Sequence, residues 1–121
     1  MPPSKPVVLA LPQQSERQAV QAILEQMSVT AFCAPTGREA VIYLEDNDCA
    51  GLTSDLQLPD MHAWSLLREV REVGLLPRLT VYVFSNEYLV STLPGANLIV
   101  RPIAQPQLLR LLSNAFGDGS F

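Results

Sequence analysis

The sequence predicts an α/β fold in which a doubly wound sheet of five parallel strands is covered by helices on both faces. Short apolar runs alternate along the chain with longer segments of helical spacing, and this alternation is typical of βαβ units. The first run, Val7–Leu11, is wholly apolar, as expected for a strand buried on both faces of a parallel sheet. The chain has 121 residues, of which 48% are hydrophobic, so it can bury a core without disulfides or metal.

The predicted strands are short runs of apolar and β-branched residues, and a proline or a polar residue lies at or just after the end of each. Pro12 stops the first strand, and Asp55 closes the third. The third strand is less apolar than the first, because it contains Thr53 and Ser54. The five predicted strands are Val7–Leu11, Val29–Cys33, Ala50–Asp55, Leu79–Phe84 and Leu98–Val100.

Four segments carry apolar residues at helical spacing together with helix start and stop signals. Ser15 is a favourable N-cap for the first helix, Thr36 opens the second, and Gly74 ends the third. Pro106 suits the first turn of the last helix, where its missing N–H has no intrahelical partner in any case. The predicted helices are Glu16–Met27, Thr36–Asp46, Ala63–Val73 and Pro106–Phe116.

The connection between the fourth and fifth strands is too short for a full crossover helix. Only eleven residues, Asn86–Ala96, are available, whereas a typical helix takes about 11–12 residues and each flanking loop about 4–6. The segment also contains Pro94-Gly95, which favours a turn. The fourth helix is therefore expected to be shortened to about one turn or to be absent.

Composition excludes several classes of function. A formal net charge of -4 gives no basic footprint for nucleic acid or for an anionic membrane. No apolar run approaches the roughly 18 residues needed to cross a bilayer, and the proline-rich N-terminus is not a signal peptide.

Cys33 and Cys49 are expected at opposite edges of the sheet, too far apart for a disulfide. We expect a single domain over residues 1–121, with a core of about 6–116, located in the cytoplasm.

Sites in open parallel sheets lie at the carboxyl ends of the strands. The residues at these ends are Pro12 and Gln13 after the first strand, Asp55 on the third, Ser85 after the fourth and Arg101 after the fifth. We expect them to meet in space.

His62, the single histidine, makes no metal site and is expected to be a solvent-facing loop residue. The first loop has no glycine with which to cradle the phosphate of a flavin.

Several short motifs, in this order and spacing, resemble response-regulator receiver domains over about residues 6–116. The resemblance rests on Asp55-x-x-x-Pro59, Thr36-Gly37-Arg38-Glu39-Ala40, Ser85, Gly95-Ala96-Asn97 and Arg101-Pro102. It implies a flavodoxin-like fold with strand order 2-1-3-4-5 and a place in bacterial two-component signal transduction. It also makes Asp55 the phosphoacceptor position, with Pro59, Arg101 and Pro102 lining the site.

The chain departs from the family at the residues that hold metal. Receivers bind a divalent cation through acidic residues after the first strand, where this chain has Pro12 and Gln13. Proline offers no side-chain ligand, and glutamine offers a neutral carbonyl where a hard dication prefers carboxylates. Glu16 is the nearest acid, one turn further along.

Further departures affect the phosphoryl contact and the switch. Arg101 stands where the family has lysine, and its planar fork is not equivalent to an ammonium. An Arg101–Asp55 ion pair that locks the site is therefore expected. Ser85 occupies the position of the switch hydroxyl, but Leu98 stands where the family has an aromatic switch residue. His62-Ala63 replaces a common Asp-Gly, so the loop loses a residue free to take positive φ.

Two functional hypotheses follow. The first is a degenerate receiver, or pseudo-receiver, that is not an enzyme, needs no cofactor and acts by phosphorylation-independent protein–protein interaction. Its partner would be a histidine kinase, a regulator or a second copy. The partner would bind the face formed by residues 89–94, the fifth strand and the last helix, where the trimmed crossover should expose apolar surface of the fourth and fifth strands.

The alternative is a magnesium-dependent phosphoacceptor with Asp55 as the phosphorylation site, within a larger regulator or hybrid kinase. It requires Glu16 or Asp60 to help hold the metal ion. Trp64 is expected near Asp55, at the start of the third helix, where it could report on metal binding.

Overall fold

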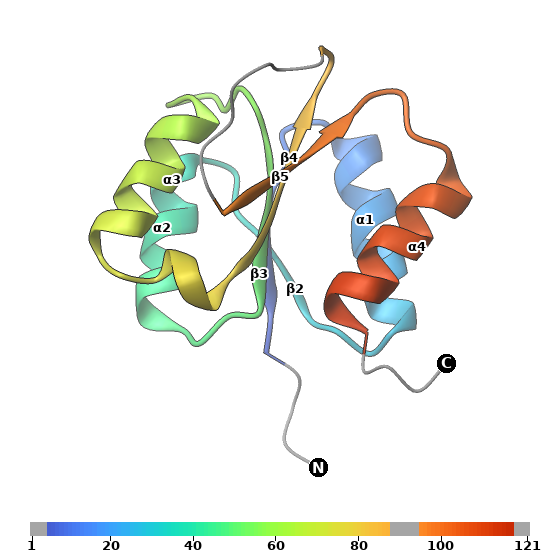
Figure 1. Ribbon diagram of the computed structural model, residues 1–121, viewed down its shortest axis with the longest axis horizontal. Helices are drawn as coiled ribbons and strands as arrows, with labels where there is room; N and C mark the ends of the chain where they lie inside the picture. Colours follow the sequence, from blue (N-terminus) through green and yellow to red (C-terminus); the bar gives the residue numbers. More distant parts are fainter. Residues whose placement is uncertain (1–4, 88–94, 118–121) are drawn as a thin grey trace.

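The computed structural model describes residues 5–87 and 95–117. Its centre is a five-stranded parallel sheet with the order β2-β1-β3-β4-β5, which confirms the predicted topology (Figure 1). The elements are β1 Val7–Ala10, α1 Gln14–Gln26, β2 Ala31–Cys33, α2 Gly37–Asp46, β3 Gly51–Asp55, α3 Ala63–Glu72, a 3-10 helix η1 Leu76–Arg78, β4 Thr80–Ser85, β5 Ala96–Val100 and α4 Gln105–Phe116.

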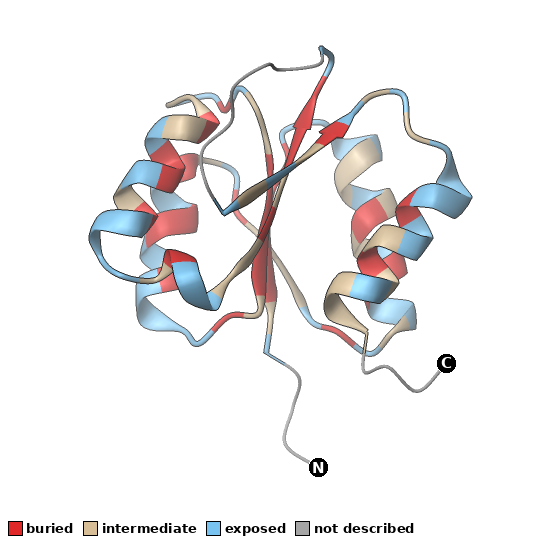
Figure 2. Ribbon diagram, in the orientation of Figure 1, coloured by how far each residue is buried: buried red, intermediate tan, exposed pale blue. Residues whose placement is uncertain are grey.

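Helices cover both faces of the sheet, as predicted. Helices α1 and α4 lie on one face, and α2 and α3 lie on the other (Figure 1). Figure 2 shows that each helix buries the side turned toward the sheet and exposes the opposite side. The apolar core is accordingly divided into two clusters, one on each face of the sheet. All four residues of β1 are buried, which explains why this strand is wholly apolar.

The parallel register brings the carboxyl ends of the strands to one edge. Asp55, the last residue of β3, pairs with Phe84 of β4. Ser85, the last residue of β4, pairs with Val100, the last residue of β5. Arg101 follows directly, and its backbone N–H donates to the Ser85 carbonyl oxygen at 2.8 Å. Residues that are 46 positions apart in the chain are thereby brought to the same place.

The helix starts agree with the sequence in part. Thr36 is the N-cap of α2, and its Oγ1 accepts from the Glu39 backbone N–H at 3.1 Å, as expected. Ser15 is not the N-cap of α1: the helix begins at Gln14, and its cap is Gln13, whose side chain makes no capping bond. His62 is also not a free loop residue, because it caps α3 and its Nδ1 accepts from the Trp64 backbone N–H.

The trimmed fourth crossover is described only at its ends. Asn86, Glu87, Gly95 and Ala96 are not helical, and the predicted shortened helix falls on residues 88–94, outside the described residues.

The expectation of exposed apolar strands holds only for β5. Val100 is 37% exposed and Leu98 is half-buried. On β4, by contrast, Val81 and Val83 are fully buried, so the prediction was wrong for this strand. The physical reason is that both residues belong to the core cluster on the α2/α3 face, together with Leu76 of η1, an element that the sequence analysis did not include.

The remaining predictions concern the two cysteines and membrane-spanning segments. Cys33 and Cys49 are both free thiols, and desolvation followed by the nearby Asp48 charge raises the pKa of Cys49 to about 11. A thiol with so high a pKa carries little thiolate at neutral pH. Among the described residues, no helix is long and apolar enough to cross a membrane.

Asp60 anchors the loop that follows β3 to the start of α2. Its Oδ1 accepts from the Gly37 N–H at 2.8 Å, and its Oδ2 accepts from the Arg38 N–H at 3.0 Å. A Cβ on Gly37 would overlap the Met61 side chain, so glycine permits the close approach of this loop. Partial burial works against ionisation, but the two N–H bonds and the Arg38 charge lower the pKa of Asp60.

We expect Asp60→Ala to lower the free energy of unfolding by about 1 kcal/mol at neutral pH, the usual cost of losing a helix cap. Because the folded-state pKa of Asp60 is lowered, its contribution is fully present above the unfolded-state value of about 3.9 and is lost as pH falls through the folded-state value. The difference between variant and parent should therefore vanish in acid, which urea denaturation along a pH series measures.

The matched control is Asp48→Ala. Asp48 pairs with Lys5, but both side chains are well exposed, so the loss should stay below about 0.5 kcal/mol. Equal losses for the two variants, or a loss at Asp60 that does not change with pH, would contradict the anchoring role of Asp60.

Candidate functional site

Arg101 lies at the centre of a polar cluster at the carboxyl edge of the sheet. Its Nε donates to Glu16 Oε2 at 2.7 Å, and its Nη2 donates to Glu16 Oε1 at 2.5 Å. The same Nη2 donates to Asp55 Oδ2 at 2.6 Å, and Nη1 donates to Asn86 Oδ1 at 3.2 Å. One guanidinium group therefore joins the first turn of α1, the end of β3 and the residue after β4.

The second oxygen of Asp55 is also bonded. Asp55 Oδ1 accepts from the Gln57 backbone N–H at 3.0 Å. Each carboxylate oxygen thus has a donor, one from the guanidinium and one from the loop that Asp60 anchors. A carboxylate held in this way by a charged group and a backbone amide has a defined orientation.

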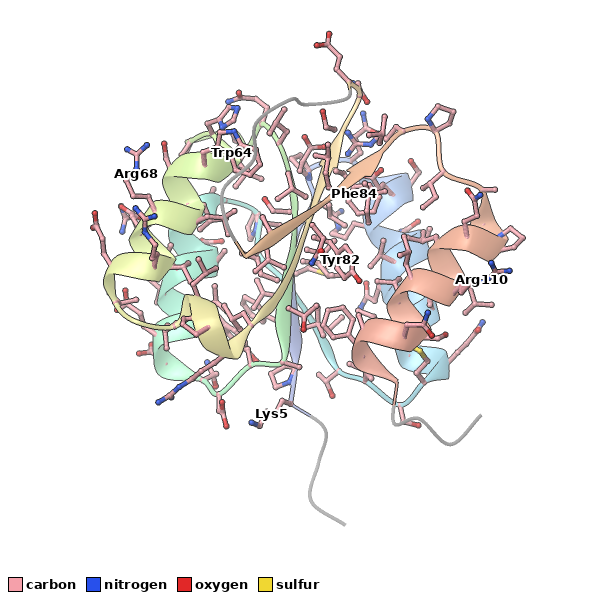
Figure 3. The ribbon with its side chains drawn as sticks, in the orientation of Figure 1. Lys5, Trp64, Arg68, Tyr82, Phe84 and Arg110 are labelled. Atoms are coloured by element: carbon pink, nitrogen blue, oxygen red, sulfur yellow. The ribbon has the colours of Figure 1, made fainter. Side chains whose placement is uncertain are left out.

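The cluster is largely shielded from water. The side chains of Arg101, Glu16 and Asp55 are 19%, 17% and 17% exposed. Arg101 Cζ lies 5.2 Å from the centroid of the Phe84 ring, and Figure 3 shows Phe84 beside β5 at the upper part of the sheet. Contact of a cation with an aromatic face adds attraction that grows as water is excluded.

The surrounding groups favour the protonated form of the Arg101 guanidinium. The hydrogen bond to Glu16, and then that to Asp55, raise the pKa of Arg101 above its already high value despite desolvation. Two carboxylates surround one guanidinium, so the cluster contains one more acidic group than basic groups.

The Arg101–Asp55 ion pair agrees with the expectation from the sequence. The contact of Arg101 with Glu16, which uses two hydrogen bonds, was not expected. Glu16 was considered there only as a metal ligand for the alternative hypothesis. A signal existed: Glu16 is an acid in the first turn of the helix that follows β1, and this turn lies at the same carboxyl edge as Asp55 and Arg101. Its 85-residue separation from Arg101 hides the contact from local patterns.

Several residues named from the sequence do not join the cluster. Pro12, Gln13, Pro59 and Pro102 are all exposed, and none of them forms a side-chain hydrogen bond with Asp55 or Arg101. The Arg101–Pro102 peptide bond is cis. Leu98 lies on β5 opposite Val83 and is half-buried.

Ser85 is fully engaged by the loop that follows it. Its side chain is buried, and its Oγ donates to the Glu87 carbonyl oxygen at 2.7 Å. The same Oγ accepts from the Glu87 backbone N–H at 3.1 Å. The hydroxyl therefore closes a local turn and makes no described bond to Asp55 or Arg101.

The residues present do not fit a magnesium ion in this arrangement. Among residues 5–87 and 95–117, no group of three or more His, Cys, Asp or Glu side chains could hold a metal. The two carboxylates at the edge, Glu16 and Asp55, both bind Arg101. Asp60, which the alternative hypothesis moves toward the metal, is bonded instead to α2. A hard dication needs several oxygen ligands, and here a guanidinium takes them.

A hollow remains beside the cluster. It has a volume of about 310 Å³, and its lining includes Asp55, Gln57, Ser85, Glu87 and Arg101. Two residues with carboxylates, Asp55 and Glu87, and one with a guanidinium, Arg101, line it. A dianionic phosphoryl group would therefore meet net negative charge rather than a cation-rich site.

Comparison with known proteins shows what this geometry resembles. No protein-family model and no curated protein matches the sequence. Solved structures do match: a response-regulator receiver domain protein from Bacillus halodurans has a TM-score of 0.80 at 20% identity, over 93% of this chain and 97% of that one.

Two further structures agree. One is the receiver domain of a sensor histidine kinase from Pseudomonas aeruginosa with a magnesium ion coordinated in its active-site cleft, with a TM-score of 0.78 at 16% identity over 93% and 98% of the two chains. The other is a chemotaxis response regulator of Vibrio cholerae, with a TM-score of 0.79 at 19% identity over the same shares. The chain therefore has the flavodoxin-like fold of response-regulator receiver domains.

Proposed function

We propose that the protein is a pseudo-receiver, a signalling module of the two-component type that acts by binding another protein without being phosphorylated. The observation that carries the proposal is the double engagement of Arg101 by Glu16 and Asp55. A built-in cation thus binds the carboxylate that the resemblance makes the phosphoacceptor. We also propose that the chain is a non-enzymatic, cytoplasmic single domain, either alone or within a larger regulator.

The balance of acidic and basic groups at the site supports this proposal. Phosphoryl transfer brings a dianionic group onto a carboxylate, and catalysis depends on cations that neutralise the developing charge. In this site the one cation is already shared between two carboxylates, with Glu87 lining the same hollow. Attack by Asp55 would first require its Oδ2 to leave Arg101, which breaks a shielded, charge-assisted hydrogen bond.

The signal-transmitting residues support the same reading. In receivers a phosphorylation signal passes from a hydroxyl to an aromatic side chain on the fifth strand. Here the hydroxyl of Ser85 is occupied on both sides by Glu87, and Leu98 has no ring to reorient. Even a phosphorylated Asp55 would lack the usual route to the β5 face.

The alternative function is a magnesium-dependent phosphoacceptor. One observation favours it: Glu16 and Asp55 both lie within hydrogen-bond distance of one guanidinium, so two carboxylates converge at the edge of the sheet. If Arg101 swung away, a dication could take its place between them. The proposed function and the alternative therefore differ in one respect, which is whether Arg101 leaves.

Mass spectrometry separates the two functions. We expect no phosphoryl adduct when the folded protein is incubated with Mg²⁺ and a small phosphoryl donor such as acetyl phosphate, because Asp55 is held by Arg101. Intact mass measures the adduct directly, and Asp55→Asn is the control. An adduct in the parent protein that disappears in Asp55→Asn would overturn the proposal and support the alternative.

Removing the Arg101 guanidinium should create a binding site for a divalent metal ion. We expect Arg101→Ala to lose about 1–3 kcal/mol of stability in the absence of metal, because Glu16 and Asp55 are left unpaired while partly buried. Added Mg²⁺ should then raise the melting temperature of Arg101→Ala but not that of the parent protein.

The matched control for this experiment is Arg38→Ala. Arg38 also pairs with an acid, Glu69, but it is 57% exposed and lies outside the cluster. This variant should lose little stability and gain no response to Mg²⁺. A parent protein that Mg²⁺ stabilises as strongly as Arg101→Ala would contradict the role of Arg101 as a substitute for the metal.

For the binding surface, we propose the edge formed by β5 and α4. Two of the apolar side chains left open to solvent lie there, Val100 at 37% exposure on β5 and Leu109 at 42% on α4. Strand β5 is also an edge strand of the sheet, and it pairs with β4 alone among the described strands. A histidine kinase, a regulator or a second copy would cover this surface. Residues 89–94 of the predicted face lie outside the described residues.

Sedimentation measurements test the version with a second copy. We expect the parent protein to self-associate, and Val100→Asp with Leu109→Asp to weaken the association at least about tenfold by placing charges in an apolar contact. The control is Val73→Asp, at a position that is 49% exposed and lies at the end of α3. Equal effects of both changes would contradict the assignment of the surface, and a monomer at every concentration would exclude the homodimer.

A further inference from the structure

A second surface lies at the opposite edge of the sheet from β5. Strand β2 is the other edge strand, and α2 packs beside it (Figure 1). Between them is a hollow of about 440 Å³, which we call the β2–α2 groove. Its lining includes Phe32, Pro35, Glu39, Ile42, Tyr43 and Asp46.

The floor of the groove is apolar and preformed. The rings of Phe32 and Tyr43 stack, with centroids 3.8 Å apart and planes inclined by 8°. Both rings pack against the core cluster on the α2/α3 face, which fixes their position. Ile42 stands beside them and is 50% exposed, the most exposed large apolar side chain among the described residues. An exposed aliphatic side chain next to a rigid aromatic pair is a favourable anchor site for another apolar group.

Acidic groups flank this floor at both ends. Glu39 and Asp46 lie seven residues apart on α2, which places them about 10 Å apart along the helix axis, with Ile42 and Tyr43 between them. Both are exposed, and neither forms a salt bridge among the described residues. Arg38, the cation next to Glu39, is bound to Glu69. The carboxylates are therefore available to a ligand.

We propose that the β2–α2 groove binds a basic amphipathic helix of another protein. Such a helix would carry two cations about seven residues apart, one for each carboxylate, and an apolar side chain between them on the same face. The apolar side chain would contact Ile42 and the edges of the stacked rings. Binding of an amphipathic helix in an apolar groove is a common mode of recognition.

The charge pattern argues against a second copy as the occupant. No described helix of this chain carries two basic residues seven positions apart, since α1 has only Arg17, α2 only Arg38 and α4 only Arg110. Helix α3 has Arg68 and Arg71, three positions apart. The net charge of -4 also makes two copies repel each other and attracts a basic partner.

The β2–α2 groove shares no residue with the Arg101 cluster. The groove and the cluster lie on different elements, since the groove is built by β2 and α2 and the cluster by α1, β3 and the end of β5. Three strands separate β2 from β5 in the sheet. A failure of the groove experiment would therefore leave the proposed function untouched, and the reverse also holds.

The test uses the full chain labelled with ¹⁵N and a synthetic helical peptide with two arginines seven residues apart and two leucines between them. We expect shifts of amide resonances confined to β2 and α2. A peptide of the same sequence with glutamates in place of the arginines should bind at least about tenfold more weakly, because exposed carboxylates face both cations.

Variants locate the contact. Ile42→Ala should weaken binding about tenfold, because it removes the exposed apolar anchor, whereas Val73→Ala should leave it within about twofold. Glu39→Gln with Asp46→Asn should weaken binding about three- to tenfold and remove most of its salt dependence. All four substitutions are at exposed positions and should leave the fold intact, which circular dichroism checks.

Three results would overturn the proposal. The first is no shift at millimolar peptide. The second is equal binding of the arginine and glutamate peptides, which would mean nonspecific apolar contact. The third is a set of shifts outside β2 and α2, or equal losses for Ile42→Ala and Val73→Ala, which would place the binding elsewhere.

Discussion

The guanidinium of Arg101, held by Glu16 and Asp55, is the interaction on which the candidate site depends. It links α1 to the ends of β3 and β5 and thereby fixes three elements that the chain brings together from distant positions. The ion pairs are shielded, so removing one partner is expected to cost more than the pairs contribute relative to apolar residues. The cluster is thus a poor source of net stability, but it sets the local geometry strictly.

The same cluster determines which charged groups the carboxyl edge of the sheet presents. The planar fork of the Arg101 guanidinium binds both carboxylates at once. The anchoring of the next loop by Asp60 and the turn closed by Ser85 add to the rigidity. All three features restrain the loops at the carboxyl edge of the sheet.

Two such surfaces lie at opposite edges of the same sheet and differ in character. The β5–α4 edge offers Val100 and Leu109, both apolar, with no acidic group on α4. The β2–α2 groove combines an apolar floor with flanking carboxylates. A parallel sheet has only two edge strands, and here each edge carries one of the proposed contacts.

The sequence by itself determined the α/β class, the order of strands and helices, and the edge at which Asp55, Ser85 and Arg101 meet, because hydrophobic periodicity and parallel-sheet topology are local and general rules. It also indicated the Arg101–Asp55 pair. Only the tertiary structure decided that Glu16 is the main partner of Arg101, that Asp60 binds the start of α2, and that Val81 and Val83 of β4 are buried. These outcomes depend on side-chain reach and on packing between residues far apart in the chain, which no local pattern encodes.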